Sequence, residues 1–343
     1  MPRYGVLMLP SYNRVYFQSS IELAISELGV ANKQLKQKCT DIMTEEIAGV
    51  NYLVFNTKEP LDKEDIKLLS RLSFVYALYE LLADDQLRLL PVALDPDYHF
   101  SDDIVSILKY SGKTNENFTR LLVNIAWITS DSFGKERPHL LDPVCGRGTS
   151  LFQGLIYGFN TSGIEQDKTA IKQATTFFSR YLKTKRFKHT ASQSKMSENK
   201  KKICDITVFE TSRDKESYKA GDKMLAAFYR GDTRNAARLI KNKSVDMIVG
   251  DLPYGVKHGS NAKTGSFSRN PAGLLREALP HWYKLLKKGG SIVLSWNTYL
   301  SSKDDLAQIM QDSGFKLLSG DPYNGFAHRV DQAIIRDIIV GKK

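Results

Sequence analysis

The chain of 343 residues is 42% hydrophobic and 25% charged, a composition typical of a folded globular protein with a large buried core. Its apolar runs are all shorter than the roughly 20 residues that a membrane-spanning helix needs, which excludes a transmembrane helix. The net charge of +11 attracts polyanions, and nucleic acid is the commonest polyanion in a cell.

Residues 1–112 predict a small N-terminal domain. A strand over 4–9 precedes a helix with apolar residues at helical spacing, and a strand over 51–55 precedes a second helix over 63–82. Two strand–helix pairs of this length favour a ferredoxin-like α+β domain of the RNA-binding type. The segment 109–116 (KYSGKTNE) is rich in Gly, Ser, Thr and Asn and predicts a linker, so we place the domain boundary at 112.

Strict alternation of strands and helices begins after this linker and continues over 113–343. Such alternation predicts an α/β fold of the Rossmann-like class, with a doubly wound and mostly parallel sheet. The connection over 319–332 is too short for a crossover helix, so the last strand should enter the sheet antiparallel. The expected strands are 139–141, 161–165, 227–230, 244–249, 291–295, 315–318 and 333–340.

A basic insertion over 183–222 interrupts this alternation. Its first part, KTKRFKHTASQSKMSENKKK (183–202), contains eight Lys and Arg residues against one Glu and almost no apolar residues. One interpretation is a solvated, disordered loop. The other, which we favour, is an arm that contacts phosphate groups.

The segment DPVCGRGT (142–149) predicts a cofactor loop between a buried strand and a helix. Gly146 and Gly148 allow a ligand to approach the backbone closely. A dinucleotide-binding loop would have a third glycine where this chain has Leu151. Asp142 can instead attract an ammonium group while the N–H groups at the helix start attract a carboxylate, so the loop suits an amino acid.

Two further acidic residues end the next two strands. Glu165 lies 19 residues after Gly146, the spacing at which a carboxylate reaches ribose hydroxyls, and Asp232 can accept from an adenine amino group. Each acid alone could equally be a helix N-cap or a solvated turn residue. Together with Asp142 they predict a site for S-adenosylmethionine, which combines an amino acid, a ribose and an adenine.

The fourth strand leads directly into DLPYG (251–255), where we expect the chemistry. An exocyclic amine of a base is a poor nucleophile because its lone pair is delocalised. Asp251 and the backbone carbonyl of Leu252 could accept its two hydrogens, Pro253 would hold the turn, and Tyr254 would stack on the base. In isolation this segment could also be a capped turn without chemistry.

These motifs resemble those of a known family. DPVCGRGT resembles motif I of class I S-adenosylmethionine-dependent methyltransferases, in the branch that methylates amino groups of RNA and DNA bases. DLPYG resembles the (D/N)-P-P-(Y/F) signature of the same branch. The replacement of its first proline by Leu252 resembles the THUMP-associated tRNA guanosine N2-methyltransferases, which favours RNA.

The resemblance covers about 113–343 and implies roles for individual residues. It implies that Asp142, Gly146 and Gly148 form the loop at the methionine end, that Glu165 binds the ribose and that Asp232 binds the adenine. The helix over 117–126 resembles the segment that closes over the methionine end. Its ligand candidate in this chain is Thr119, with Phe118 and Arg120 beside it.

The expected activity is therefore methylation of an exocyclic amino group in RNA, with N2 of guanosine in tRNA as the leading target. S-adenosylmethionine would be released as S-adenosylhomocysteine. Methylation of adenine N6 in DNA or RNA stays open, because the same acceptors serve either amine. A non-catalytic protein that binds S-adenosylmethionine or RNA is an alternative of a different class, and the intact DLPYG motif argues against it.

The cysteines and the N-terminus bear on location and metals. The chain has three cysteines, an odd number, and they lie far apart in the sequence at Cys39, Cys145 and Cys204. This pattern supports neither a disulfide framework nor a zinc site. The first residues, MPRYGVLMLPS, lack the layout of a secretory signal. We therefore expect a cytoplasmic protein, and no metal because a sulfonium is already an activated methyl donor.

Overall fold

A computed structural model describes residues 1–9, 14–83, 86–110, 113–253 and 271–343. These residues form two compact units, the first comprising 1–97 with 319–336 and the second comprising 98–318 with 337–343. The units therefore divide at 97, whereas the sequence placed the boundary at 112. Residues between these positions belong to the second unit because they bond to it, as the 2.8 Å hydrogen bond from the backbone N of His99 to the carbonyl of Ile156 shows.

The first unit is built on an antiparallel five-stranded sheet with the order β2-β3-β1-β4-β5. Its first six elements follow the sequence β-α-β-β-α-β, so the predicted ferredoxin-like arrangement is present, with β5 added at one edge. The elements are β1 (Arg3–Met8), α1 (Arg14–Ala31), β2 (Thr40–Ile47), β3 (Val50–Asn56), α2 (Lys63–Arg71), β4 (Val75–Ala83), β5 (Leu87–Val92) and β14 (His328–Arg329).

The prediction of a helix over 63–82 was wrong for the second half of this range. The helix α2 ends at Arg71 because Leu72 is extended, with ψ of 145°, and Ser73 donates its backbone N–H to the buried carboxylate of Glu27. The chain then enters β4, whose β-branched and aromatic residues favour a strand. Strand β2 was not predicted, because only Ile47 among its eight residues is buried and the apolar pattern is weak.

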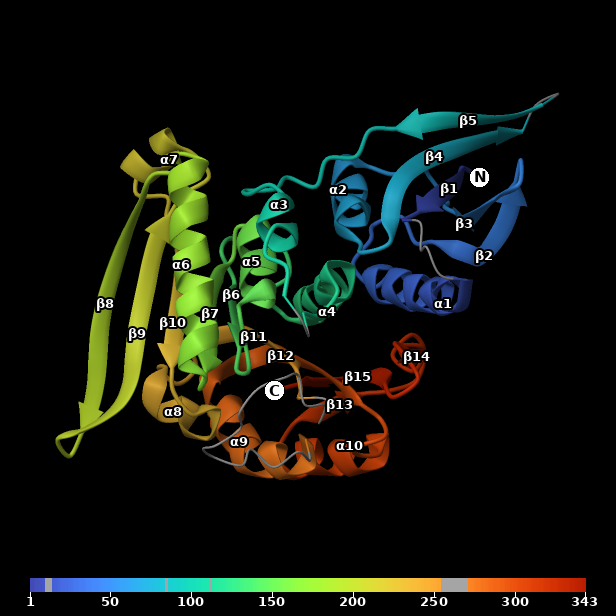
Figure 1. Ribbon diagram of the computed structural model, residues 1–343. Helices are drawn as coiled ribbons and strands as arrows, with labels where there is room; N and C mark the ends of the chain where they lie inside the picture. Colours follow the sequence, from blue (N-terminus) through green and yellow to red (C-terminus); the bar gives the residue numbers. More distant parts are fainter. Residues whose placement is uncertain (10–13, 84–85, 111–112, 254–270) are drawn as a thin grey trace. The chain divides into compact units, whose positions relative to one another are not determined.

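The second unit contains a sheet with the order β13-β15-β12-β11-β6-β7-β10-β9-β8 (Figure 1). Strands β10, β7, β6, β11 and β12 are parallel, and β15 pairs antiparallel with β13, so the predicted Rossmann-like class with an antiparallel last strand is confirmed. The strands are β6 (His139–Asp142), β7 (Asn160–Glu165), β8 (His189–Glu198), β9 (Lys201–Thr211), β10 (Met224–Arg230), β11 (Val245–Asp251), β12 (Leu286–Asn297), β13 (Lys316–Leu318) and β15 (Ile335–Lys342).

Helices cover both faces of this sheet. The helices are α3 (Asp103–Ser106), α4 (Glu116–Thr129), α5 (Thr149–Ile156), α6 (Lys168–Thr184), α7 (Lys215–Lys219), η1 (Thr233–Asn235), α8 (Ala236–Leu239), α9 (Pro271–Leu285) and α10 (Lys303–Asp312). Helices α4, α5 and α6 cover one face, and α8, α9 and α10 cover the other (Figure 1).

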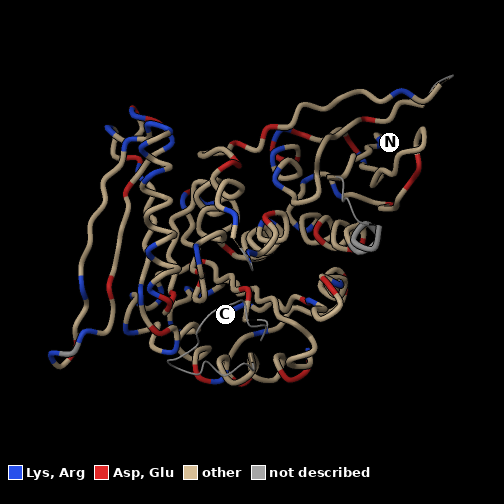
Figure 2. Tube along the Cα trace, in the orientation of Figure 1, with Lys and Arg blue, Asp and Glu red and all other residues tan. Residues whose placement is uncertain are grey.

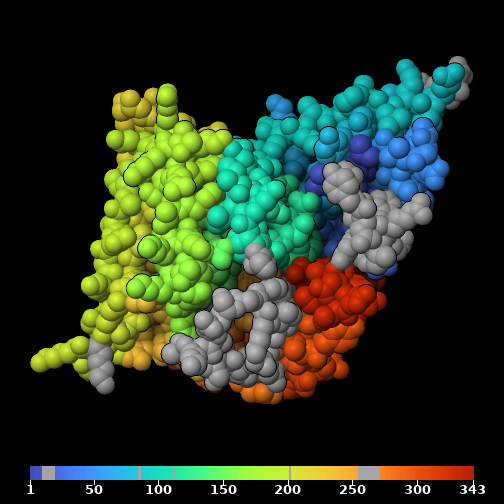
Figure 3. Space-filling model, in the orientation of Figure 1, coloured from blue at the N-terminus to red at the C-terminus, as the bar shows by residue number. Residues whose placement is uncertain are grey.

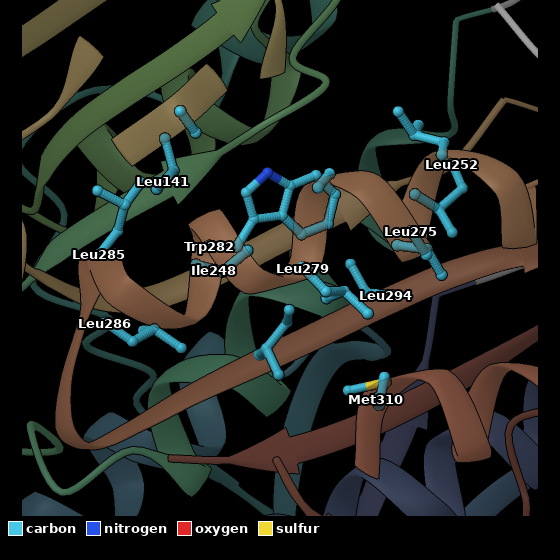
Figure 4. Close-up of a cluster of buried hydrophobic side chains, with 14 of the residues drawn as sticks. Leu141, Ile248, Leu252, Leu275, Leu279, Trp282, Leu285, Leu286, Leu294 and Met310 are labelled. Atoms are coloured by element: carbon cyan, nitrogen blue, oxygen red, sulfur yellow. The ribbon is translucent and has the colours of Figure 1, made fainter. Parts of the chain in front are cut away.

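The main core lies between the sheet and α9. Trp282 of α9 is fully buried there and packs with Ile248 of β11 and Leu294 of β12 (Figure 4). Apolar burial of this extent is the principal source of stability for the strands that carry the predicted site. Within the described residues, no helix is both long and apolar enough to span a membrane.

The basic insertion is a β-hairpin followed by a short helix. Strands β8 and β9 pair antiparallel from His189↔Thr211 to Glu198↔Lys201, and β9 pairs with β10, so the hairpin extends the central sheet at its edge. The interpretation as a disordered loop was therefore wrong. Backbone pairing to β10 orders the hairpin even though most side chains of β8 are exposed and polar.

Candidate functional site

The predicted acids lie at the carboxyl ends of parallel strands. Asp142 ends β6, Glu165 ends β7 and Asp251 ends β11, while Asp232 follows β10 by two residues. The order β10-β7-β6-β11-β12 reverses direction between β6 and β11. In open α/β sheets this reversal marks the crevice in which ligands bind.

The side chain of Asp142 holds the glycine-rich loop that follows β6. One carboxylate oxygen accepts the backbone N–H of Val144 at 2.9 Å, and the other accepts the hydroxyl of Ser150 in the first turn of α5. Gly148, the N-cap of α5, has a φ of +84°, a left-handed conformation that favours glycine. The loop therefore presents the N-terminus of α5, with its free N–H groups, at the strand ends.

Burial raises the pKa of Asp142 to about 7, and the negative charges of Asp251 and Glu165 act in the same direction. The hydrogen bonds from Ser150 and Val144 oppose this shift only in part. Asp251 and Glu165 therefore both lie close enough to Asp142 to act on its charge. A cationic group beside Asp142 would be favoured, because it would offset the cost of burying this negative charge.

The raised pKa of Asp142 predicts a pH dependence of stability. Below about pH 4, Asp142 is protonated in both the folded and the unfolded protein. Between about pH 4 and 7 only the folded protein keeps this proton, so the stability that the proton contributes is lost as the pH rises. We expect the free energy of unfolding of the ligand-free protein to fall across this window by up to about 1.4 kcal/mol per pH unit relative to Asp142→Asn. Urea unfolding of both proteins at several pH values measures the difference. Parallel profiles would contradict the assignment.

Cys145 lies in the same loop and is buried. Burial raises the pKa of its thiol well above the usual value, and the charge of Asp142 adds to the effect. Its sulfur occupies the space beside Gly163 of β7, where an added Cβ would lie 2.6 Å from it. A protonated and packed thiol is a structural residue.

Glu165 connects the ends of β7 and β6. Its two carboxylate oxygens accept the backbone N–H of Gly146 at 3.1 Å and that of Asp167 at 2.7 Å. Burial raises the pKa of Glu165, against the effect of these hydrogen bonds. The carboxylate is thus positioned beside the glycine-rich loop, and its role as a ribose ligand stays a prediction.

Asp232 is held in a turn after β10. It is the N-cap of η1, and its carboxylate forms an ion pair with Arg234 at 2.6 Å. Partial burial opposes its ionisation, but the hydrogen bonds from Arg234 outweigh this and lower the pKa of Asp232. Trp282 fixes the turn by donating its indole N–H to the hydroxyl of Thr233 at 2.9 Å. Asp232 is therefore a helix cap, and its role toward adenine stays a prediction.

Asp251 ends β11 with its carboxylate fixed on two sides. Ser295 of β12 donates its hydroxyl to one oxygen, and Thr114 donates to the other. Leu252 is fully buried and donates its backbone N–H to the carbonyl of Ser295 at 2.8 Å, while Pro253 is exposed. Tyr254 lies outside the described residues.

Tyr110 and Thr114 make three contacts that were not predicted, because the segment 109–116 was interpreted as a linker. The hydroxyl of Tyr110 lies 3.3 Å from that of Thr149, and the guanidinium of Arg147 lies over the Tyr110 ring at 4.1 Å. Thr114 reaches Asp251. The segment thus contacts both the glycine-rich loop and the end of β11, and no local pattern of Gly, Ser and Thr distinguishes such a contact from a linker.

Thr119 is buried in the first turns of α4. Its hydroxyl donates to the backbone carbonyl of Asn115 at 3.2 Å, within its own helix. The contact of Thr119 with the methionine end of S-adenosylmethionine stays a prediction. Among the described residues, no group of three or more His, Cys, Asp or Glu side chains could hold a metal ion.

A family model described as "UPF0020: RMKL-like, methyltransferase domain" matches residues 109–314, more than half of the chain. The match contains all four strand ends described above. No curated protein sequence matches the chain.

Solved structures of methyltransferases are among those similar to this chain. TrmN from Thermus thermophilus is 14% identical with a TM-score of 0.39, and the similarity covers 88% of this chain but 59% of that one. A TehB-like SAM-dependent methyltransferase from Corynebacterium glutamicum is 14% identical with a TM-score of 0.35, over 62% and 84%. An S-adenosylmethionine-dependent methyltransferase from Clostridium acetobutylicum is 11% identical with a TM-score of 0.36, over 60% and 83%.

Proposed function

Because this chain belongs to the RMKL-like methyltransferase domain family and its cofactor is S-adenosylmethionine, as the sequence predicted, we propose that it methylates an exocyclic amino group of a base in RNA. The proposed target is N2 of guanosine in tRNA. The observation that supports this best is the position of Asp251, at the switch point of the sheet beside the loop held by Asp142. An acceptor for amine hydrogens thereby lies next to the proposed site of the methyl donor.

The residues at the strand ends suit this cofactor. Asp142, whose pKa is raised by burial, would gain from an ammonium group beside it. The N–H groups at the start of α5 would bind the carboxylate of the amino-acid part. Glu165 would accept from the ribose hydroxyls and Asp232 from the adenine amino group. When bound, S-adenosylmethionine supplies a methyl group on a sulfonium.

Asp251 would act on the acceptor amine. Its carboxylate, oriented by Ser295 and Thr114, accepts a hydrogen bond from the amine while the backbone carbonyl of Leu252 accepts the second hydrogen. These two acceptors would concentrate charge on the nitrogen as it attacks the methyl group, and Asp251 would take the departing proton. The bound cofactor would supply the methyl group and keep the electron pair of the broken C–S bond on its sulfur. Acceptors fixed in advance stabilise this transition state more than the ground state.

The proposal of RNA as the substrate rests on charge and motif. The net charge of +11 favours a polyanion, and the DLPYG sequence resembles that of tRNA guanosine methyltransferases. Tyr254 is proposed to stack on the target base and the N-terminal unit to contribute RNA binding. We place this activity in the cytoplasm, where the three free cysteines, all buried, would stay reduced.

Incubation of the protein with bulk tRNA and S-adenosylmethionine carrying a labelled methyl group tests the function. Mass spectrometry of the digested RNA should show labelled N2-methylguanosine. Labelled N6-methyladenosine would replace the proposed target by the adenine alternative. Binding of S-adenosylmethionine without transfer to tRNA, total RNA or DNA would instead support a non-catalytic protein.

The contact between Thr114 and Asp251 predicts a role for Thr114 in positioning the carboxylate. Thr114→Val keeps the shape but removes the hydroxyl, and a hydrogen bond to a charged group is worth about 1.5–3 kcal/mol. We expect kcat to fall about tenfold, with the Kd for S-adenosylmethionine unchanged. The matched variant Thr114→Ser keeps the hydroxyl and should stay within about twofold of wild type. Equal kcat values for the Val and Ser variants would show that the hydroxyl of Thr114 does not position Asp251 for methyl transfer.

A further inference from the structure

A groove of about 460 Å³ runs between α6 and the β8–β9 hairpin. Phe178 of α6 packs against Phe209 of β9, with ring centroids 5.0 Å apart, and this contact seats the helix on the inner strand of the hairpin. Residues of α6, such as Ser179, and residues of the outer strand β8, such as Ala191 and Gln193, line the groove. The exposed surfaces of α6 and the hairpin adjoin in the yellow-green part of Figure 3.

Basic and uncharged residues line the groove. None of the described residues that line it is acidic. The side chains that can bind a phosphate carry hydroxyl, amide or cationic groups, and they include Thr176, Ser179, Arg180, Lys183, Gln193 and Thr207.

The two cations of the groove differ from three of their basic neighbours, which are paired with acids. Arg180 and Lys183 are exposed and form no ion pair within the described part of the chain. In contrast, Lys185 pairs with Asp103 at 2.5 Å, and Lys202 and Arg230 both pair with Asp205, at 2.7 and 2.5 Å. Figure 2 shows further Lys and Arg positions along α6 and at the turn of the hairpin. The groove therefore holds positive charge that the fold does not neutralise.

We propose that this groove binds the sugar–phosphate backbone of the RNA substrate, an inference that rests on the proposed function. Phosphates are bound mainly by Arg and Lys together with Ser, Thr and Gln side chains, which is the set present here. A surface that served only solubility would mix both signs of charge.

The position of the groove indicates which part of the RNA it contacts. Helix α6 begins three residues after Glu165, and Arg180 lies 12 residues further, about 18 Å along the helix at 1.5 Å per residue. The groove therefore contacts the RNA away from the target nucleotide. The groove should therefore determine the affinity for RNA and not the rate of methyl transfer. It requires an RNA long enough to reach from the strand ends to the groove.

The double variant Arg180→Gln/Lys183→Gln tests the groove. The matched control Lys241→Gln/Lys288→Gln removes two exposed charges near the amino ends of β11 and β12. Filter binding of bulk tRNA at several salt concentrations should show about tenfold weaker binding for the groove variant and a logarithmic salt slope smaller by about 1–2. Transfer to tRNA should show a raised KM with kcat unchanged. The single variant Ser179→Asp, which adds an acid to the groove, should weaken binding as well.

The outcomes separate the groove from the proposed function. The proposal that the groove binds RNA would be contradicted if the groove variant and the control bound tRNA equally. It would also be contradicted if the wild-type protein bound no tRNA. Weaker binding by the groove variant together with no methyl transfer by the wild-type protein would support the groove and contradict the proposed function. Thermal melting and the Kd for S-adenosylmethionine should match between the two double variants, which shows that both are folded.

Discussion

Replacement of Asp251 by Ala is expected to lower kcat for methyl transfer at least about 10³-fold, because the amine would lose both the acceptor that concentrates charge on nitrogen and the group that takes its proton. The Kd for S-adenosylmethionine should change by less than about threefold, since Asp251 ends β11 while the proposed cofactor ligands follow β6, β7 and β10. Single-turnover transfer to tRNA, with calorimetry for cofactor binding, measures both quantities.

Two further variants sharpen this prediction. Asp251→Asn keeps one acceptor oxygen of the same shape, so its rate should lie between those of wild type and the Ala variant. Asp312→Ala removes an exposed carboxylate at the end of α10 and should behave as wild type. A lowered melting temperature with parallel loss of cofactor binding in Asp251→Ala would show that Asp251 only holds Thr114 and Ser295 in place.

Replacement of Glu165 by Gln should raise the Kd for S-adenosylmethionine about 10- to 100-fold, because a hydrogen bond to a charged group is worth about 1.5–3 kcal/mol. The Gln side chain keeps one acceptor but loses the charge, and its amide would oppose the backbone N–H of Gly146 or Asp167. Isothermal titration with S-adenosylmethionine measures the change. The effect on kcat at saturating cofactor should be small.

The matched control for this variant is Glu210→Gln. Glu210 lies on β9 and pairs with Lys223 at 3.0 Å, so the substitution removes the same charge from a surface pair. Its Kd for S-adenosylmethionine should equal that of wild type. An unchanged Kd in Glu165→Gln as well would show that Glu165 only fastens the glycine-rich loop to β7.

The alternation of elements and the acids at the strand ends were predictable because both are local patterns. Apolar residues that lead into a carboxylate are visible in the sequence before Asp142 and Asp251, and NTSGIE (160–165) is a shorter signal that ends in Glu165. The carboxyl ends of parallel strands meet at one edge of a sheet, so recognition of the alternation also placed these residues together. The fold class and the family followed from the same motifs.

Other features depended on partners that are distant in sequence. The chain over 63–82 alternates too weakly to separate helix from strand, and pairing with β1 and β5 made its second half β4. The outer strand β8 has few apolar residues, and the order of the hairpin comes from the pairing of β9 with β10 and from the buried side chains of β9, Cys204 and Phe209.

The sequence alone therefore determined the class of fold, the family and the set of acids at the strand ends. Only the tertiary structure decided what holds each acid. Thr114 and Asp251 are 137 residues apart, and their hydrogen bond exists because the chain at Thr114 passes the end of β11. The groove beside Arg180 likewise needs a helix and a hairpin in contact. Local propensity specifies an element and its polarity, but contacts between elements depend on how the whole chain packs.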